Sequence, residues 1–466
     1  MLDRHILTFN ENIIGLRDFI SLIGPFIEEH HEKAVKEHQL IVDAFEIAKK
    51  IEVEEDETQK AELQNQLKSV FDGQVIKAIP IDKDKIKIEG KGSENLPDFA
   101  IAVPVSLNPR IDQAMKAPRK TNYQKELLYK NAFIGLLSSV EWFYSQVLHY
   151  YYDKHPEAAG IKKKTMTLED LKTFGTVQDA EKFLIDSKIE EVFRAGFDAW
   201  MDILKDEVKL KLPYVRPFFN ELLEVYQRRN LLVHNGGIVN SIYISKVSSE
   251  ISKDLKIGDK LTITSEYLEN AICKLHIVFT LIAAELWKKL EPNEESRADI
   301  LNSIAYRNMN QGRWEVAEWL SCFIKDDENL KSRVKTVGQL NFWLSRKKRG
   351  NRELVIGEVL KADFTDKSLR YQLAVSALTD NKEEFFDLLP ETLRTKSLEI
   401  KELLEFPIFD EMRNTSEFED FKLTSEEFKA YKQIETNSKD DNEEETLDDV
   451  IDELIEEATI DRKEQE

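Results

Sequence analysis

The stretch AFIGLLSSVEWFYSQV, residues 132–147, decides the fold class. Its apolar side chains return every three or four positions, at Ala132, Leu136, Leu137, Val140, Phe143, Tyr144 and Val147. This spacing places one broad apolar face along a helix. Residues 13–51 and 267–290 show the same period. The chain is therefore predicted to be mostly all-α.

Two further helical features lie near the N-terminus. Within residues 13–51, Pro25 predicts a break between two helices, because proline removes a backbone hydrogen bond from a helix interior. Residues 52–71 predict a third and more polar helix.

Two segments have a β-type texture instead. Ile86 and Ile88 alternate with lysines, and apolar residues up to Val105 follow a stretch rich in glycine, serine and proline. Short strands or an extended linker are expected there. Residues 242–263 contain a Gly-Asp turn between two short β-type runs, which predicts a small β-hairpin insertion.

A chain of 466 residues is too long for one ordinary core, so two to four domains are expected. Residues 1–107 form an N-terminal helical region with a short extended segment. A boundary is predicted at 108–123, which carries two prolines and several basic residues, and 123–290 form a helical bundle. Residues 293–436 form an array of helical hairpins, and 437–466 form an acidic tail.

The helical-hairpin prediction rests on small residues after Pro292. Ala305, Gly312 and Ala317 keep the relative spacing of the small residues in a tetratricopeptide repeat. The repeat intervals that follow are irregular and most aromatic positions do not match. The region therefore resembles tetratricopeptide hairpins in a degenerate form.

Charge is concentrated rather than uniform. The formal net charge of −22 argues against a protein that coats nucleic acid through bulk charge. Residues 439–466 contain 14 acidic and 3 basic residues, a net of −11, so half of the excess lies in this short segment. With so few aromatic residues to bury, the tail is predicted to be disordered.

Several classes of protein are excluded by composition. Two cysteines, Cys273 and Cys322, provide no disulfide framework or cysteine metal site, which fits a reducing cytoplasm. The first residues predict no signal peptide, and the longest apolar run, 277–287, is too short to span a bilayer. His31 and His38 lie two helical turns apart, too far to share one zinc ion. We expect no metal, no cofactor and no membrane partner.

The segment Arg228-Arg229-Asn230-Leu231-Leu232-Val233-His234-Asn235-Gly236-Gly237 carries the chemistry. Cleavage of RNA without a metal uses the 2′-hydroxyl as nucleophile and needs a base, an acid and positive charge on the phosphate. Histidine suits proton transfer near neutral pH, and arginine presents a permanently charged fork to a phosphate.

Helical geometry places only some of these side chains on one face of the helix. Asn230 and His234 are four residues apart and share one helix face. Arg229 lies roughly 140° round the helix from His234, so its long side chain or a distorted last turn would have to reach the same phosphate. Arg228 is the alternative, and spacing alone does not choose between the two arginines. In the structural alternative, His234 caps the helix C-terminus and the arginines are solvated.

Residues from about Tyr123 to Leu290 resemble a HEPN (higher eukaryotes and prokaryotes nucleotide-binding) domain, a helical bundle. The resemblance is carried by Arg229-Asn230-Leu231-Leu232-Val233-His234, which matches the ribonuclease signature of that family, and by the acidic-aromatic helix segment 138–143. It implies that Arg229 and His234 are catalytic and that Asn230 assists them. Glu141 would support the site. The resemblance departs in the long stretch between Tyr150 and Phe193 and in the insertion after Asn240.

The same resemblance implies a metal-independent endoribonuclease whose motifs meet across a homodimer interface. The biological setting would be bacterial antiviral defence or a toxin-like stress response in the cytoplasm, and the partner would be an RNA substrate. The alternative hypothesis is a catalytically silent HEPN-type scaffold or nucleotide-binding module that docks a protein partner through the C-terminal hairpins.

A second basic cluster lies outside the motif. Arg346-Lys347-Lys348-Arg349 could contact an RNA backbone. The structural alternative is a solvated helix face, which is the more frequent role of such a run.

Overall fold

The computed structural model describes residues 2–74, 76–81, 98–160 and 165–431. These residues are helical apart from short connections and one two-stranded sheet, so the predicted all-α class is confirmed. The chain divides into two compact units, Met1–Leu286 and Trp287–Glu466, which are described separately. The predicted acidic tail, 437–466, lies outside the described residues.

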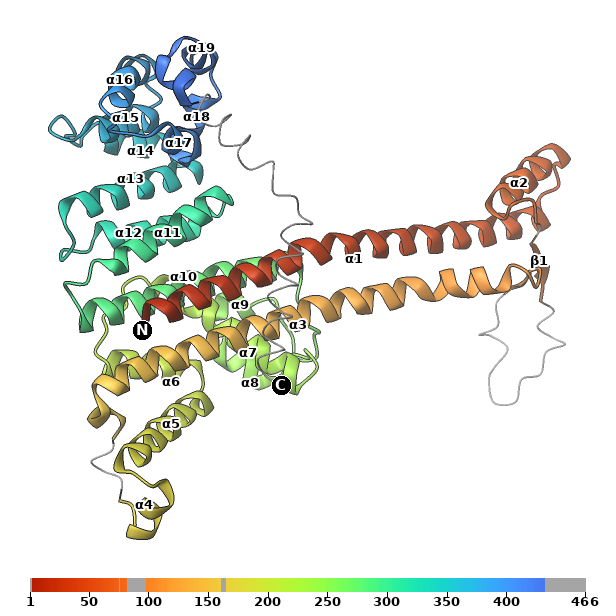
Figure 1. Ribbon diagram of the computed structural model, residues 1–466. Helices are drawn as coiled ribbons and strands as arrows, with labels where there is room; N and C mark the ends of the chain where they lie inside the picture. Colours follow the sequence, from red (N-terminus) through yellow and green to blue (C-terminus); the bar gives the residue numbers. More distant parts are fainter. Residues whose placement is uncertain (1, 75, 82–97, 161–164, 432–466) are drawn as a thin grey trace, which may run out of the picture. The chain divides into compact units, whose positions relative to one another are not determined.

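Two long helices organise the first unit. Helix α1 spans Leu2–Val53 and helix α3 spans Asn108–Lys154, and they run side by side (Figure 1). Near the start of α1 the ring of Phe9 stacks on Phe143, with centroids 4.3 Å apart. Farther out, the Glu28 carboxylate accepts from Lys125 Nζ at 2.8 Å and from Tyr129 Oη at 3.1 Å. Apolar and ionic contacts thus join the two helices at separate levels.

The structure has a continuous helix at two places where the sequence predicted an interruption: the helix break at Pro25 and the domain boundary at 108–123. Pro25 lies inside α1 and Pro118 lies inside α3, and both helices continue through them. An internal proline costs about 3 kcal/mol, and the long packed interface of α1 with α3 offsets this cost. Pro109 lies in the first turn of α3, where its missing N–H would have had no helical partner. Residues 1–107 therefore belong to the same unit as 123–286.

The distal ends of α1 and α3 carry a small subdomain. Helix α2, Glu57–Val70, begins at Asp56, whose carboxylate accepts from the amides of Thr58 and Gln59. Strands β1, Lys77–Pro80, and β2, Phe99–Ala102, pair antiparallel with Lys77 opposite Ala102. Strand β2 falls within the segment expected to be extended, whereas Ile86 and Ile88 lie outside the described residues. The subdomain has its own apolar core, formed by Ile41, Ala44, Ala48, Leu67, Phe71, Ile76, Ala78, Leu107, Ile111 and Ala114.

An aromatic cluster around Trp200 fixes the helix that carries the motif. The Trp200 ring is 2% exposed, stacks on Tyr144 of α3 at 4.9 Å and meets Tyr226 edge-on at 5.1 Å. Its indole N–H donates to the carbonyl of Val192 at 3.1 Å, and its own carbonyl accepts from Tyr144 Oη at 2.9 Å. Because Tyr226 belongs to helix α7, Phe219–His234, this cluster sets the position of α7 against α3.

The remaining helices of this unit are short, apart from α5 and α10. They are η2 Pro156–Ala159, α4 Leu168–Phe174, α5 Val177–Ala195, α6 Phe197–Asp202, the π-helical turn η4 Ile203–Glu207, η5 Arg216–Phe218, α8 Ser241–Lys246, α9 Ser249–Ser252 and α10 Ser265–Leu290. By length and composition α10 could cross a membrane, but 78% of its most apolar stretch is buried inside the protein. The core helix of a globular domain has the same properties.

The predicted β-hairpin within 242–263 is wrong for the described residues. Residues 241–246 and 249–252 are helical. The antiparallel contact of this region joins 237–239 to 258–261 through an isolated bridge between Ile238 and Lys260 and neighbouring backbone hydrogen bonds. Asn240 caps α8 by accepting from the Tyr243 amide at 2.9 Å. Tyr243 and Val247 pack with Leu231 in a small apolar core. Packing and capping therefore override the β propensity of the local residues.

In the second unit, consecutive helices pack as antiparallel pairs joined by tight turns (Figure 1). The residues singled out by their repeat spacing lie in the first pair, where Ala305 and Ala317 are fully buried and Gly312 makes the turn with φ +71°. The resemblance to a tetratricopeptide repeat stays a prediction. The helices are α11 Ser296–Asn310, α12 Trp314–Lys325, α13 Ser332–Lys348, α14 Arg352–Val359, α15 Leu369–Leu378, α16 Lys382–Arg394, α17 Ile400–Glu405, η6 Pro407–Phe409, α18 Asp410–Arg413 and α19 Ser416–Thr424.

A buried ion pair ties the start of this unit together. The carboxylate of Asp327 bonds Arg297 Nη2 at 2.8 Å, with both side chains fully buried, and lies 3.2 Å from Lys288 Nζ. Gly338 then lets α13 approach α12 closely, because a Cβ at this position would lie 2.8 Å from Ile324.

We predict that Trp200→Ala lowers the free energy of unfolding by about 3–5 kcal/mol, because it opens a cavity among the rings that hold α7. Urea unfolding followed by circular dichroism measures the loss. The matched control is Trp142→Ala, a tryptophan on α3 that is 40% exposed, with an expected change of about 0.5 kcal/mol. Equal losses in the two variants would contradict the central role of Trp200.

Candidate active site

The motif helix α7 ends at His234 through a double-glycine turn. The amides of Asn235 and Gly237 both donate to the carbonyl of Leu231, at 2.9 and 3.0 Å. Gly236 and Gly237 have φ values of +60° and +85°, a region that glycine adopts without strain. A Cβ on Gly237 would also lie 2.5 Å from the carbonyl oxygen of Leu261. The glycines thus stop the helix and let the following chain fold back against it.

The last turn of α7 presents a polar face to solvent. Asn230, Val233 and His234 are exposed, with Val233 at 45%. No hydrogen bond or ion pair engages the His234 imidazole within the described part of the chain. The imidazole is therefore free to meet a ligand or a second protein chain.

Arg229 lies at the edge of this face and is anchored to α3. Its Nη1 donates to Asn230 Oδ1 at 3.2 Å, and its Nη2 lies 3.7 Å from the Glu141 carboxylate. Its Nε is buried and has no hydrogen-bond partner among the described residues. Burial raises the pKa of Glu141, and the Arg229 charge opposes that shift. The guanidinium is thus partly satisfied and keeps donors for an anion.

Arg228 has a different role. Its Nε donates to Glu224 at 2.6 Å, its Nη1 donates to the carbonyl of Thr262 at 3.3 Å, and its guanidinium lies 4.0 Å from the centre of the Tyr267 ring. Burial lowers the pKa of Arg228, but Tyr267 and the Glu224 carboxylate outweigh it, so the pKa is raised. Of the two arginines that sequence spacing left open, Arg228 is committed to the fold.

The Glu224 carboxylate is the centre of this network and was missed from the sequence. It is 5% exposed and also accepts from Tyr243 Oη at 2.6 Å and from Tyr267 Oη at 2.7 Å. Burial and this carboxylate together raise the pKa of both tyrosines. The four-residue spacing from Glu224 to Arg228 was a signal for an ion pair, whereas the two tyrosines come from distant segments.

The five residues of the candidate site therefore do not form one connected cluster. Glu141, Arg229 and Asn230 form a connected set, and His234 lies one turn farther along the same helix. Within one chain, no bond joins His234 to Arg229 in the part that the structure describes. Arg228 belongs to the buried network instead.

The second basic cluster is neutralised by its surroundings. These cations close the end of α13, where positive charge favours the helix dipole. Each has an acidic partner: Arg346 with Glu358 at 3.1 Å, Lys347 with Asp380 at 2.5 Å, Lys348 with Glu411 at 2.9 Å and Arg349 with Glu315 at 3.2 Å. The Lys347 side chain is only 4% exposed. This geometry favours a structural role for the cluster over contact with RNA.

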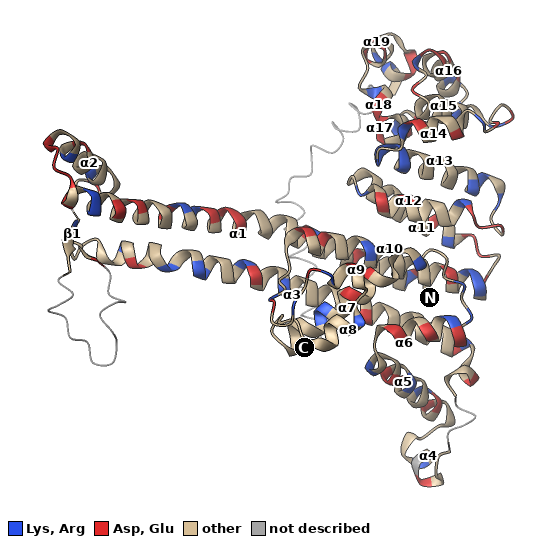
Figure 2. Ribbon diagram, turned by 180° about the vertical axis from the view of Figure 1, so that it is seen from behind, with Lys and Arg blue, Asp and Glu red and all other residues tan. Residues whose placement is uncertain are grey.

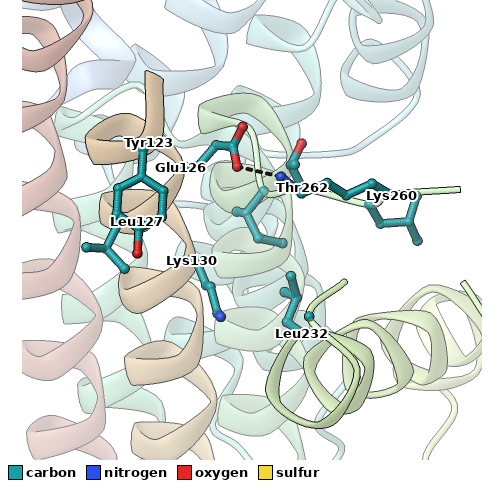
Figure 3. A pocket seen from close by; sticks show the side chains of 10 residues that line it. Tyr123, Glu126, Leu127, Lys130, Leu232, Lys260 and Thr262 are labelled. Atoms are coloured by element: carbon teal, nitrogen blue, oxygen red, sulfur yellow. Dashed lines mark hydrogen bonds and ion pairs between the residues drawn. The ribbon is translucent and has the colours of Figure 1, made fainter. Parts of the chain in front are cut away.

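A pocket of about 170 Å³ lies beside the motif. Figure 3 shows Tyr123, Leu127 and Lys130 of α3 on one side and Leu232 of α7 across from them. Lys260 closes another side and donates to Glu126 at 2.9 Å, a bond that lowers the pKa of Glu126.

We compared the chain with known protein families, with curated proteins and with solved structures, and none of them matches it. The chemistry of the site therefore rests on its own residues.

We predict that Arg228→Ala lowers the free energy of unfolding much more than Arg229→Ala does. Arg228→Ala leaves the buried Glu224 without its cation, which costs about 3–5 kcal/mol. Arg229→Ala removes a partly exposed ion pair and costs about 1 kcal/mol at most. Chemical unfolding of both variants measures the difference. A larger loss for Arg229→Ala would reverse the assignment of the two arginines.

Proposed function

We propose that this protein is a metal-independent endoribonuclease of the HEPN type. The observation that carries the proposal is the solvent-open His234 imidazole, one helical turn after Asn230, with the Arg229 guanidinium anchored next to Asn230. The resemblance of the motif to the HEPN ribonuclease signature supports the same conclusion. The products would be a 2′,3′-cyclic phosphate and a 5′-hydroxyl.

The reaction needs two proton transfers and one centre of positive charge. The 2′-oxygen attacks the adjacent phosphorus and the bond from phosphorus to the 5′-oxygen breaks. His234 takes the proton from the 2′-hydroxyl or gives one to the leaving 5′-oxygen, and histidine suits either transfer near neutral pH. Arg229 stabilises the negative charge of the phosphorane through its fork of donors. Asn230 positions the phosphate or the imidazole.

A homodimer would complete this site. At the end of α7 one chain offers a single imidazole, that of His234, whereas the reaction uses both a base and an acid. Two copies joined through the exposed ends of α7 would bring a second His234 and a second Arg229 to the same phosphate. The exposed Val233 between Asn230 and His234 supplies apolar surface for such a contact. In this proposal the enzyme acts in bacterial defence or a toxin-like response in the cytoplasm, with the C-terminal hairpins docking a protein partner.

The alternative function is a silent HEPN-type scaffold. It is favoured by one observation, the ion pair between Arg229 and Glu141, which already engages the guanidinium that catalysis would use. In that case the helical pairs of the second unit would bind the partner and the motif would stabilise the bundle.

Cleavage in the presence of EDTA separates the two functions. We predict that the wild-type protein cleaves RNA to cyclic-phosphate ends and that His234→Ala lowers the rate by a factor of about 10²–10⁴, the usual contribution of a general acid or base. Arg229→Ala should lose activity to a similar degree, and Asn230→Ala less. Gel analysis of the fragments, with end-group mapping, measures the rates.

The matched control is His155→Ala, a histidine with a 42% exposed side chain at the C-terminal end of α3. It should cleave like the wild type. Cleavage by His234→Ala at the wild-type rate would refute the proposed site. No cleavage by any of the proteins would favour the scaffold.

The dimer is tested at Val233. We predict that Val233→Asp is monomeric and inactive, because two carboxylates would face each other across the proposed contact. Analytical ultracentrifugation of the wild type and the variant measures the oligomeric state. Ile257→Asp serves as a control, since Ile257 is an apolar residue that is 70% exposed elsewhere in the same unit. A monomeric wild-type protein that cleaves RNA would exclude the composite site.

A further inference from the structure

The outer half of α3 carries a stripe of basic and aromatic side chains that the catalytic proposal does not use. The stripe consists of Arg119, Lys120, Tyr123, Leu127 and Lys130. At 100° per residue these five positions fall within an arc of about 100° of the helix circumference. They span the 12 residues 119–130, or about 16 Å of helix.

This stripe faces away from α1. The residues of α3 that α1 covers include Ala114, Thr121 and Tyr129, which are buried on the opposite side of the helix. Arg119 and Lys120 are exposed, the Tyr123 ring is 64% exposed, and Leu127 is 40% exposed. Figure 2 shows the Lys and Arg positions in blue along the ribbon of α3. The stripe is therefore a free surface of the first unit.

The cations of the stripe make no ion pairs among the described residues, whereas two neighbouring lysines of α3 do. Among the described residues, Arg119, Lys120 and Lys130 have no acidic partner. By contrast, Lys116 pairs with Asp112 at 2.6 Å and Lys125 pairs with Glu28 at 2.8 Å. Glu126, which lines the pocket together with Tyr123, Leu127 and Lys130, pairs with Lys260 at 2.9 Å. The local charge of this surface is thus positive on a chain that is acidic as a whole.

The stripe ends in the pocket beside the motif. Tyr123, Leu127 and Lys130 form its α3 wall, while Leu232 and Gly236 belong to the motif segment itself (Figure 3). These two residues lie on either side of His234 in the sequence. A ligand that follows the stripe into the pocket therefore reaches the last turn of α7 on the face of Leu232. His234 points about 160° away round the helix, so an RNA strand would continue past Gly236, around the end of α7, to reach the imidazole.

We propose that this stripe binds the single-stranded RNA that flanks the scissile bond. Arg119, Lys120 and Lys130 contact phosphates, Tyr123 stacks on a base, and the pocket receives the base nearest the motif. Exposed aromatic rings between cations suit unstacked bases, which a duplex does not present. At about 3.4 Å per nucleotide, the stripe covers four or five stacked nucleotides. This inference rests on the proposed ribonuclease function, and it names the form of RNA that the enzyme takes.

Binding is measured on the His234→Ala protein, so that the probe stays intact. The probe is a fluorescein-labelled single-stranded RNA 12-mer, followed by fluorescence anisotropy in EDTA over a range of KCl concentrations. Adding Tyr123→Ala should weaken binding about tenfold, as expected for the loss of one stacked base. Each of Arg119→Ala, Lys120→Ala and Lys130→Ala should lower the slope of log affinity against log salt by about 0.7. Lys130→Arg keeps the positive charge and should therefore keep the salt slope of the parent protein.

Two matched controls lie on the same helix. Lys116→Ala and Lys125→Ala remove cations that already pair with carboxylates, and both should bind like the parent. Equal affinities in all variants would overturn the proposal that the stripe binds single-stranded RNA. Equally tight binding of a duplex of the same sequence would overturn it as well.

The outcome for the stripe is separate from the outcome for catalysis. Salt-dependent binding that these variants weaken, together with no cleavage by the wild type, would support the stripe and refute the ribonuclease. Cleavage by the wild type, together with binding that the variants leave unchanged, would support the ribonuclease and refute the stripe.

Discussion

The buried carboxylate of Glu224 is the constraint on which the rest of the site depends. An unpaired carboxylate at this depth would cost several kcal/mol, so the fold has to bring it donors. It finds three, on Arg228 of α7, Tyr243 of α8 and Tyr267 of α10. The residues from 235 to 264 are thereby held against α7 at one carboxylate. The same requirement turns Arg228 inward and leaves Arg229 at the surface.

The position of α7 against α3 has a second and independent cause. Tyr226 of α7 packs into the Trp200 cluster with Tyr144 of α3. Arg229 of α7 pairs with Glu141, which lies one turn before Tyr144 on α3. One side of α7 is therefore fixed by polar bonds and another by aromatic packing, and its exposed face carries Asn230 and His234. Because the helix is held on two sides, its last turn can remain open without being loose. An accessible histidine on a helix of fixed position is what the proposed proton transfer requires.

Periodicity predicted the all-α class and the course of the motif helix because both depend on which side chains face the core. It failed where a local signal was weaker than distant packing. Pro25 and Pro118 look like helix ends, but the interface between α1 and α3 is long enough to outweigh a missing hydrogen bond at each. The β-branched residues after Asn240 look like strands, but a cap and a small core with Leu231 hold them as short helices. The choice between Arg228 and Arg229 was beyond the sequence, since it is made by tyrosines 15 and 39 positions after Arg228.

An acidic protein can bind RNA only if its local charges differ from its net charge. Half of the net −22 lies in residues 439–466. In the second unit the cations at the end of α13 are cancelled one by one by acids, so a run that looks basic in the sequence is close to neutral in space. On α3 the opposite holds, because Arg119, Lys120 and Lys130 are scattered in the sequence yet share one face without acidic partners. The distribution of ion pairs, and not the count of basic residues, therefore decides which surface can attract a phosphate backbone, and it leaves that of α3 as the basic one.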